Sequence, residues 1–206
     1  MPFVPGRIQT TPLPQPQLEN TVSLEQALLQ RRSIRSYRPV PVPLAALAQL
    51  LWAAQGVSSR EGFRTAPSAG ALYPLEVLLA VSRCDELAPG LYHYRPLSHD
   101  LLLWRSQDHR PAIAAAALDQ ECVYEAAAIL VITAVPERTA VKYGSRAMRY
   151  VHLEAGHAAQ NACLQAAALG LGTVTVGAFD DTALAEALAL PEAVEPVYLL
   201  PVGMPV

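Results

Sequence analysis

A short basic cluster stands out near the start of the sequence. It consists of Arg31, Arg32, Ser33 and Arg35, in a chain that has only 15 lysines and arginines. The guanidinium group offers a planar fork of donors that suits phosphate oxygens, and a serine hydroxyl adds a neutral donor. Arginines are also favourable at the C-terminal end of a helix, because they face its negative dipole there. These residue types therefore indicate either a phosphate site or a solvated helix end.

Two segments with small side chains would leave their backbone open to a ligand. Residues 67–70 lie in a loop bounded by prolines, and Gly177 and Ala178 follow a β-type run. A flat ligand can approach such a backbone closely enough for N–H and C=O groups to bind its edge. An ordinary turn explains residues 67–70 equally well. Together with the basic cluster, the two segments could hold the phosphate, one edge and one face of a flat phosphorylated cofactor.

An amine and a phenol stand side by side in Lys142 and Tyr143, and such groups can exchange protons. A nucleophile elbow, a P-loop, HExxH and the dinucleotide-binding GxGxxG are all missing from the sequence. His152 and His157 flank Glu154, but residues five apart diverge by about 140° on a helix. We therefore predict no metal site, and we expect these three residues on the polar faces of a helix.

The N-terminal half predicts helices, a hairpin and a buried strand. Ser23 and Gln26 fit a capping box for a helix whose apolar residues would point inward. Those residues are Leu24, Ala27, Leu28 and Leu29. Pro43 suits the first position of a second helix that stops at Gly56. The later elements are a strand at residues 76–81, a hairpin of 91–94 and 101–104, a helical stretch at 110–127 and a doubly buried strand at 128–135.

A long helix is predicted from about residue 146 to residue 169. Small residues dominate one side of it, namely Ala155, Ala158, Ala159, Ala162 and Ala166. Because small residues allow close approach, we expect another helix to cross it, and the same helix of a second copy is a candidate. A strand at 173–176, a helix at 182–189 capped by Asp180 or Asp181, and a strand at 197–202 follow.

The composition predicts a globular protein. The chain has 206 residues, of which 52% are hydrophobic and 16% are charged. A net charge of −3 argues against nucleic acid as a partner, because a domain-wide basic surface is missing. The longest uncharged apolar run, residues 126–135, is about half of a membrane span. We therefore expect neither a nucleic-acid nor a membrane partner.

The N-terminal segment and the cysteines indicate where the protein works. Residues 1–20 contain five prolines and no apolar period, which predicts an extended arm, either disordered or wrapped over a partner subunit, before a single domain at 21–206. The same segment lacks the features of a signal peptide. Three cysteines without CxxC spacing favour a reducing compartment. A cytoplasmic location follows.

Four motifs, in this order along the chain, resemble the nitroreductase superfamily of FMN proteins. They are RRSIRSY, PSAGALYP, the block KYGSRAMRYVHLEAGHAAQNACLQAAALGLG and VGAFDD. The resemblance covers roughly residues 22–203. The Lys-Tyr pair and GLYHY are most similar to the SagB-type branch, which includes the thiazole/oxazole dehydrogenases. Those enzymes oxidise azoline rings in modified peptides.

The resemblance implies an α+β, nitroreductase-like fold with a central, mostly antiparallel sheet flanked by helices. It also implies an intertwined homodimer with two FMN sites at its interface. The residues that match cofactor-binding positions of the family are Arg31, Arg32, Ser33, Arg35, Pro67, Ser68, Ala69, Gly70, Gly177 and Ala178. Residues 31–35 match phosphate and ribityl contacts. Residues 67–70 match a loop that reaches the isoalloxazine, commonly from the other subunit, and Gly177 and Ala178 match a turn whose N–H approaches flavin N5.

The resemblance also implies the chemistry. Lys142 and Tyr143 match the pair regarded as catalytic in azoline dehydrogenases, where a proton leaves the substrate as hydride passes to N5. A lysine whose pKa is lowered by nearby cations could accept that proton, with the tyrosine as relay or orienter. The substrate would be a small molecule or derived from a peptide. The alternatives are an NAD(P)H-dependent nitro or quinone reductase, and a flavin-binding protein without redox turnover.

One departure concerns the phosphate site. Many nitroreductases add basic residues to it from a C-terminal segment, whereas residues 202–206 of this sequence contain none. The cluster at 31–35, or Arg146 and Arg149, would then have to suffice.

Overall fold

A seven-stranded sheet runs through the centre of the molecule. The computed structural model describes residues 9–206, and within them the strand order is β1-β4-β3-β2-β5-β7-β6, with every pair antiparallel. The strands are β1 (Thr10–Pro12), β2 (Leu75–Val81), β3 (Gly90–Arg95), β4 (Asp100–Ser106), β5 (Ala128–Ala134), β6 (Gly172–Thr173) and β7 (Glu195–Gly203). The predicted α+β class with an antiparallel central sheet is confirmed.

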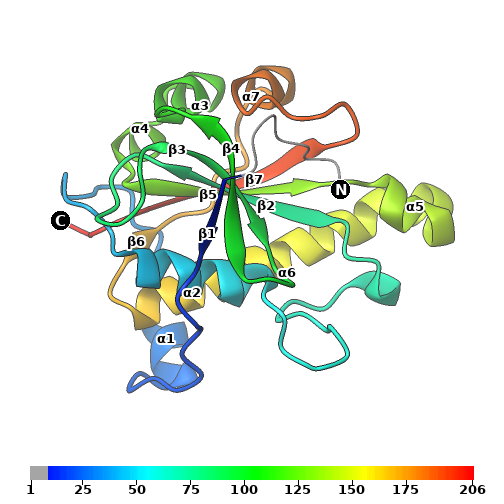
Figure 1. Cartoon of the computed structure of the whole chain (residues 1–206), viewed down its shortest axis with the longest axis horizontal. Coiled ribbons are helices and arrows are strands. Elements are labelled where there is room, and N and C mark those ends of the chain that lie inside the picture. Colours follow the sequence, from blue (N-terminus) through cyan, green and yellow to red (C-terminus); the bar gives the residue numbers. More distant parts are fainter. Residues whose placement is uncertain (1–8) are drawn as a thin grey trace.

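Helices cover both faces of this sheet (Figure 1). α1, α2 and α6 lie on one face, α3, α4 and α7 lie on the other, and α5 projects beyond the strand ends. The helices are α1 (Leu24–Gln30), α2 (Leu44–Gln55), α3 (Arg110–Ala116), α4 (Glu121–Glu125), α5 (Glu137–Tyr143), α6 (Ala147–Ala168) and α7 (Asp181–Ala187), with 3-10 turns at η1 (Ala69–Ala71) and η2 (Gly144–Arg146).

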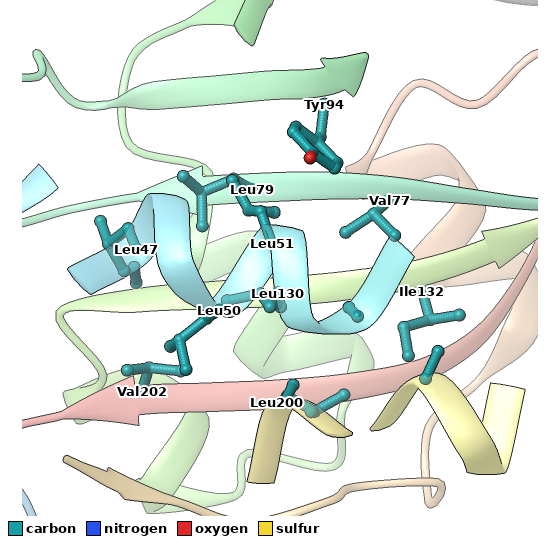
Figure 2. Packing of buried hydrophobic residues seen from close by; sticks show 14 of the residues in the cluster. Leu47, Leu50, Leu51, Val77, Leu79, Tyr94, Leu130, Ile132, Leu200 and Val202 are labelled. Atoms are coloured by element: carbon teal, nitrogen blue, oxygen red, sulfur yellow. The ribbon is translucent and has the colours of Figure 1, made fainter. Parts of the chain in front are cut away.

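β5 is an interior strand between β2 and β7 and is buried along its whole length, as its apolar, β-branched sequence predicts. On the sheet face that α2 covers, Leu50 and Leu51 of that helix pack with Leu79, Leu130 and Leu200 of the sheet (Figure 2). Full burial of a leucine side chain stabilises the fold by roughly 2 kcal/mol. The sheet and α2 therefore form a firm support for α6.

The small residues of α6 pack inside the chain. They are Ala155, Ala158, Ala159, Ala162 and Ala166, and each is at most 2% exposed. The predicted close helix crossing is confirmed, but its partner is α2 rather than a second copy, because the short side chains let α2 and the sheet approach α6. The outer face of α6 carries Leu153 and Gly156, both exposed.

α1 begins with the predicted capping box. Ser23 Oγ accepts from Gln26 N at 3.2 Å, and Gln26 Oε1 accepts from Ser23 N at 3.3 Å. Ala27 is buried, but three leucines expected inside are exposed, namely Leu24 (62%), Leu28 (53%) and Leu29 (72%). The prediction is wrong for these leucines, because this short helix packs mainly on α6 and only one of its sides is buried.

Several element boundaries differ from the prediction. Pro43 is the N-cap of α2 rather than its first helical residue. The stretch 110–127 forms two helices, since Leu118 and Asp119 have φ values of 59° and 54° that end α3. Of the strand expected at 173–176, only β6 and a bridge from Val176 to Leu199 form. The hairpin of β3 and β4, the helix capped by Asp180 and the closing strand β7 are confirmed.

The N-terminal arm joins the sheet of its own chain. β1 pairs with β4 at the sheet edge, and Leu13 is buried. Gln17 and Gln49 of α2 exchange two hydrogen bonds of 2.8 and 2.9 Å. The first part of the predicted arm, residues 1–8, lies outside the described residues.

Candidate functional site

The basic cluster, residues 31–35, forms the connection after α1 and is fixed by β6. Ile34 N donates to Thr173 O at 2.9 Å, and Ser33 stands opposite Thr173 in a parallel bridge. A Cβ on Gly172 would lie 2.7 Å from Ile34 Cγ2, so only glycine allows this close approach. The backbone of the cluster is therefore well placed although its side chains are on the surface.

The arginines of this cluster fit both interpretations of the sequence, the helix end and the phosphate site. Arg32 Nη1 donates to Leu29 O and Arg31 O, both at 2.8 Å, and so satisfies carbonyls at the end of α1. Both Arg31 and Arg32 line a hollow of about 200 Å³, and among residues 9–206 the Arg31 side chain has no hydrogen bond there. Ser33 and Arg35 are exposed. One arginine thus ends a helix, while the others leave donors open to an anion.

The Gly177–Ala178 turn follows the segment that pairs with the basic cluster. Gly177 is four residues after Thr173, a span of at most about 14 Å. Val176 exchanges two backbone hydrogen bonds with Leu199 of β7, and Ala178 O accepts from Gln120 Nε2 at 2.9 Å. Gly177 and Ala178 are exposed, and within residues 9–206 neither of their N–H groups has a protein acceptor. These N–H groups are available to a ligand.

The loop at residues 67–70 lies against the Lys142-Tyr143 pair. A Cβ built on Gly70 would stand 3.1 Å from both Lys142 Nζ and Tyr143 Oη. Gly70 has a φ of 65°, a conformation that side chains disfavour, so glycine here serves both geometry and space. Lys142 is exposed, and the Tyr143 ring lies 4.7 Å from that of Tyr150 at the start of α6.

Ser68 gives this loop its shape. Its Oγ accepts from Tyr73 N at 2.9 Å, and its carbonyl accepts from Ala71 N at 3.1 Å. Ala71 and Tyr73 have φ values of 54° and 46°, so the segment after Gly70 holds an unusual left-handed backbone. Pro67, which is exposed, and Ala69, which is half-buried, are the other members of this loop.

Glu154 is a buried carboxyl behind the loop. It lies on the inner side of α6 and is 2% exposed, so the expectation that it occupies a polar face is wrong. Burial raises its pKa to about 7, while Ser68, Arg64 and Gln55 lower it in turn. Its Oε1 has no hydrogen-bond partner among the described residues. The signal in the sequence was its place in a buried stripe, next to Ala155 and three residues after Val151.

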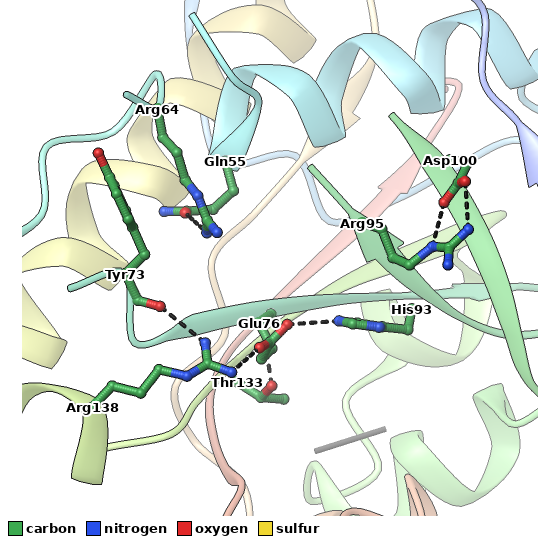
Figure 3. A network of polar contacts seen from close by, with 9 residues as sticks. All are labelled: Gln55, Arg64, Tyr73, Glu76, His93, Arg95, Asp100, Thr133 and Arg138. Carbon is green, nitrogen blue, oxygen red and sulfur yellow. Dashed lines mark hydrogen bonds and ion pairs between the residues drawn. The ribbon is translucent and has the colours of Figure 1, made fainter. Parts of the chain in front are cut away.

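A second polar network surrounds a hollow of about 380 Å³ beside the same loop (Figure 3). We call it the arginine hollow, and its titratable lining residues are Arg64, Glu76, His93, Arg95 and Arg138. Glu76 Oε2 lies 2.6 Å from His93 Nε2, and Glu76 Oε1 pairs with Arg138. Burial alone would raise the pKa of Glu76, but these two contacts outweigh it and lower the pKa. The sequence did not indicate this network, because its members come from separate elements.

The sites predicted from the sequence therefore form two groups in one chain. The basic cluster and the Gly177–Ala178 turn form the first, and the basic cluster lies beside the C-terminal end of α6. The loop at residues 67–70, Lys142 and Tyr143 form the second, at its N-terminal end. α6 has 22 residues and is roughly 33 Å long. We call the two groups the phosphate half-site and the loop half-site, and a single chain keeps them apart.

Comparison with known proteins identifies the family. The model of the nitroreductase family matches residues 28–204. The chain belongs to the nitroreductase family. A nitroreductase-like protein of Methanocaldococcus jannaschii is 44% identical over 182 residues, which are 88% of this chain and 91% of that protein.

Two solved structures extend this similarity. A nitroreductase-like protein of Ralstonia eutropha matches with a TM-score of 0.84 and 32% identity, covering 100% of this chain and 93% of that one. A chain of the Escherichia coli microcin synthetase McbBCD complex, which has truncated pro-MccB17 bound, matches with a TM-score of 0.72 and 27% identity. That match covers 84% of this chain and 69% of the other.

As a member of this family, the chain is an oxidoreductase. The family generally binds flavin and acts on small molecules. Among residues 9–206, no helix combines the length and apolarity needed to cross a bilayer. The same residues contain no group of three or more His, Cys, Asp or Glu arranged to hold a metal ion.

Proposed function

We propose that this protein is an FMN-dependent oxidoreductase that works as a homodimer and transfers hydride to or from flavin N5. The observation that carries the proposal is the separation of the two half-sites by α6. One FMN does not reach from the phosphate half-site to the loop half-site of the same chain. In a twofold dimer, the phosphate half-site of one copy can face the loop half-site of the other.

The residues of the phosphate half-site fit a flavin phosphate. Arg31, Ser33 and Arg35 have side-chain donors open to an anion, and Arg32 adds positive charge beside them. The unengaged N–H groups of Gly177 and Ala178 fit the N5 edge of the ring. Bound FMN supplies the hydride-transfer chemistry, and donors near its N1–C2–O2 edge would favour the reduced form.

The small side chains of Pro67, Ser68, Ala69 and Gly70 fit the approach of a flat ring. The exposed outer face of α6, with Leu153 and Gly156, and the exposed leucines of α1 support an interface between copies. A single chain leaves this apolar surface open, and a homodimer would cover it.

Lys142 and Tyr143 are the groups we assign to proton transfer. Lys142 would accept the proton that the substrate releases, and Tyr143, whose hydroxyl also faces Gly70, would orient or relay it. The fit of a second copy over the loop would desolvate the amine and favour its neutral, basic form. Oxidation of an azoline ring in a small or peptide-derived substrate, as in the SagB-type branch, is the reaction we favour. The similarity to the microcin synthetase chain supports it.

NAD(P)H-dependent reduction of nitro or quinone compounds is the second candidate. The similarity to nitroreductase-like proteins of two other organisms favours it. In that case Lys142 and Tyr143 would orient the acceptor. A protein that binds flavin without redox turnover is a third reading. Three unpaired cysteines agree with the cytoplasmic location that we propose.

The visible spectrum of the purified protein tests the proposal. We expect flavin absorption bands, release of FMN on denaturation, and a mass of two chains by light scattering. Anaerobic NADH or NADPH should leave the bands unchanged if azoline oxidation is the reaction, and should bleach them if the protein is a reductase. A colourless monomer that takes up no added FMN would overturn the proposal.

A further inference from the structure

We propose that the arginine hollow binds an oxoanion, the carboxylate or phosphate of the substrate or electron donor, and thereby orients that molecule against Lys142. This inference rests on the proposed function for the reaction, but the binding itself does not depend on flavin. The hollow measures about 380 Å³, within the range of small-molecule sites. Figure 3 shows Arg64, Arg95 and Arg138 coming from three separate segments.

The lining of the hollow has more positive than negative charge. Arg64, Arg95 and Arg138 line it together with one carboxylate, that of Glu76. Asp100, outside the lining, binds Arg95 through two hydrogen bonds of 2.6 and 2.5 Å. Even with Asp100 counted, three arginines face two carboxylates. The balance therefore stays positive, as an oxoanion site requires.

Arg64 is the cation that lacks a counter-ion. Its Nη1 donates to Gln55 Oε1 at 2.8 Å, and its guanidinium stacks 4.5 Å from the centre of the Tyr73 ring. Within residues 9–206 it forms no ion pair, and burial lowers its pKa against the more distant charges of Glu76 and Glu154. Arginine keeps its charge in proteins, so a half-buried guanidinium favours an incoming anion.

Arg138 connects the hollow to the proposed reaction centre. It pairs with Glu76 inside the hollow, and its Nη1 donates to Tyr73 O at 3.0 Å at the end of the loop. Arg138 and Lys142 both lie on α5, four residues apart, so their Cβ atoms are roughly 6 Å apart on one face. An anion bound by Arg138 would therefore lie on the same face of α5 as Lys142.

The rim of the hollow suits an organic body attached to the anion. It is formed by Pro96, Leu97 and Ser98 of the turn between β3 and β4, and Leu97 is 82% exposed. An apolar rim over a cationic floor favours an amphipathic acid over a simple inorganic ion. A molecule with a carboxylate or phosphate at one end and a reducible or oxidisable ring at the other would fit both the arginine hollow and the proposed reaction centre at Lys142.

Calorimetric titration of the flavin-containing protein tests the inference. The probes are benzoate, inorganic phosphate and the neutral benzamide. We expect at least one of the two anions to bind and benzamide not to bind. Preference for benzoate would indicate a carboxylate substrate, and preference for phosphate would indicate the phosphates of a dinucleotide donor. The absence of heat from both anions would overturn the inference.

Matched arginine variants locate the binding. Arg64→Gln should weaken anion binding at least about tenfold, because a charged hydrogen-bond donor is lost. Arg60→Gln is the control, since Arg60 is exposed, lies in the same loop and does not line the hollow. Equal affinity in the two variants would show binding elsewhere and overturn the inference. Arg138→Gln, checked by circular dichroism, provides a second test if Arg64→Gln fails to fold, and unchanged affinity there would have the same meaning.

Loss of the anion site and loss of the flavin give different results in these measurements. If the protein contains no flavin, benzoate titration of the Arg64→Gln and Arg60→Gln apoproteins still reports on the hollow, because the comparison cancels any anion bound at the basic cluster. If flavin is present but neither anion binds, only the orientation site is lost and the oxidoreductase proposal stands.

Discussion

Arginines lie near both ends of α6, but one group is on the surface and the other lines a hollow that contains a carboxylate. The basic cluster at residues 31–35 is continuous in sequence, lies on the surface, and its hydrogen bonds to the chain go to backbone oxygens. The arginine hollow is assembled from separate elements, and its side chains bind carboxylates, an amide and an aromatic ring. The two regions contain the same residue type but differ in where the opposing charge comes from.

This difference predicts different roles. In the arginine hollow the chain supplies most of its own counter-charge, so these residues hold the loop and the sheet edge in place as well as binding. At the basic cluster, residues 9–206 supply no carboxylate within ion-pair distance. Substitutions in the hollow should therefore affect stability, whereas substitutions in the cluster should affect ligand binding and leave stability unchanged.

The largest effect is expected at Glu76. Glu76→Gln leaves Arg138 without its counter-ion and His93 without its carboxylate, which should lower the free energy of unfolding by about 3 kcal/mol in urea denaturation. Asp108→Asn is the control, because the Asp108 side chain is 29% exposed against 12% for Glu76, so its ion pair should contribute less, about 1 kcal/mol. Equal losses in both variants would remove the distinction between the regions.

The pH dependence of this contribution has a definite sign. The pKa of Glu76 is lowered in the folded state, so its stabilisation is complete above the pKa of the unfolded chain. It is lost as the pH falls through the lowered folded value. Glu76→Gln should therefore match the parent protein more closely in acid than at pH 7.

Lys142→Ala tests the loop half-site as a catalytic region. We expect kcat for the favoured oxidation to fall at least about a hundredfold with FMN still bound, because a general base contributes on that scale. Val141→Ala is a matched control, since Val141 is its 84% exposed neighbour on α5. Unchanged turnover in Lys142→Ala would leave the pair with at most a positioning role.

The sequence predicted most of the fold because its signals were local. The buried run of β5, the capping box at Ser23, the turn residues of the hairpin and the Asp180 cap each depend on neighbours along the chain. The wrong predictions concern what a helix face contacts in the folded protein. The alanines of α6 and the leucines of α1 have the same periodicity whether they meet α2, a second copy or water.

The candidate site divides in the same way. The basic cluster and the loop at residues 67–70 were predicted from composition and motif, because each is continuous in sequence. Glu76 and His93 meet only through the pairing of β2 with β3, and Arg64 reaches them only through the path of its loop. Contacts of that kind depend on register and topology, which a single sequence does not contain.

Glu154→Gln should raise the free energy of unfolding near neutral pH, whereas Glu76→Gln should lower it. Burial raises the pKa of Glu154 to about 7, so its protonated form is favoured in the folded state. Stability from this group is complete below the unfolded pKa and is lost as the pH rises towards 7. The neutral amide should therefore raise the unfolding free energy by about 2 kcal/mol at pH 8 and by little at pH 4. A variant less stable than the parent at pH 8 would show that the carboxylate is needed by Arg64.

The smallest effect, and the sharpest contrast, is expected at the basic cluster. Arg31→Gln should raise the Kd of FMN at least about tenfold, since one charged hydrogen bond to the phosphate is lost. The unfolding free energy should change by under about 0.5 kcal/mol, because the Arg31 side chain has no ion pair in the described chain.

Riboflavin, which lacks the phosphate, separates the two explanations for such a loss. If Arg31 binds the phosphate, quenching of flavin fluorescence should give equal riboflavin affinities for Arg31→Gln and the parent protein. If the substitution instead disturbs the segment paired with Thr173, both flavins should bind more weakly. The second result would place the basic cluster with the arginine hollow, as a structural element, and would remove the difference between the two ends of α6.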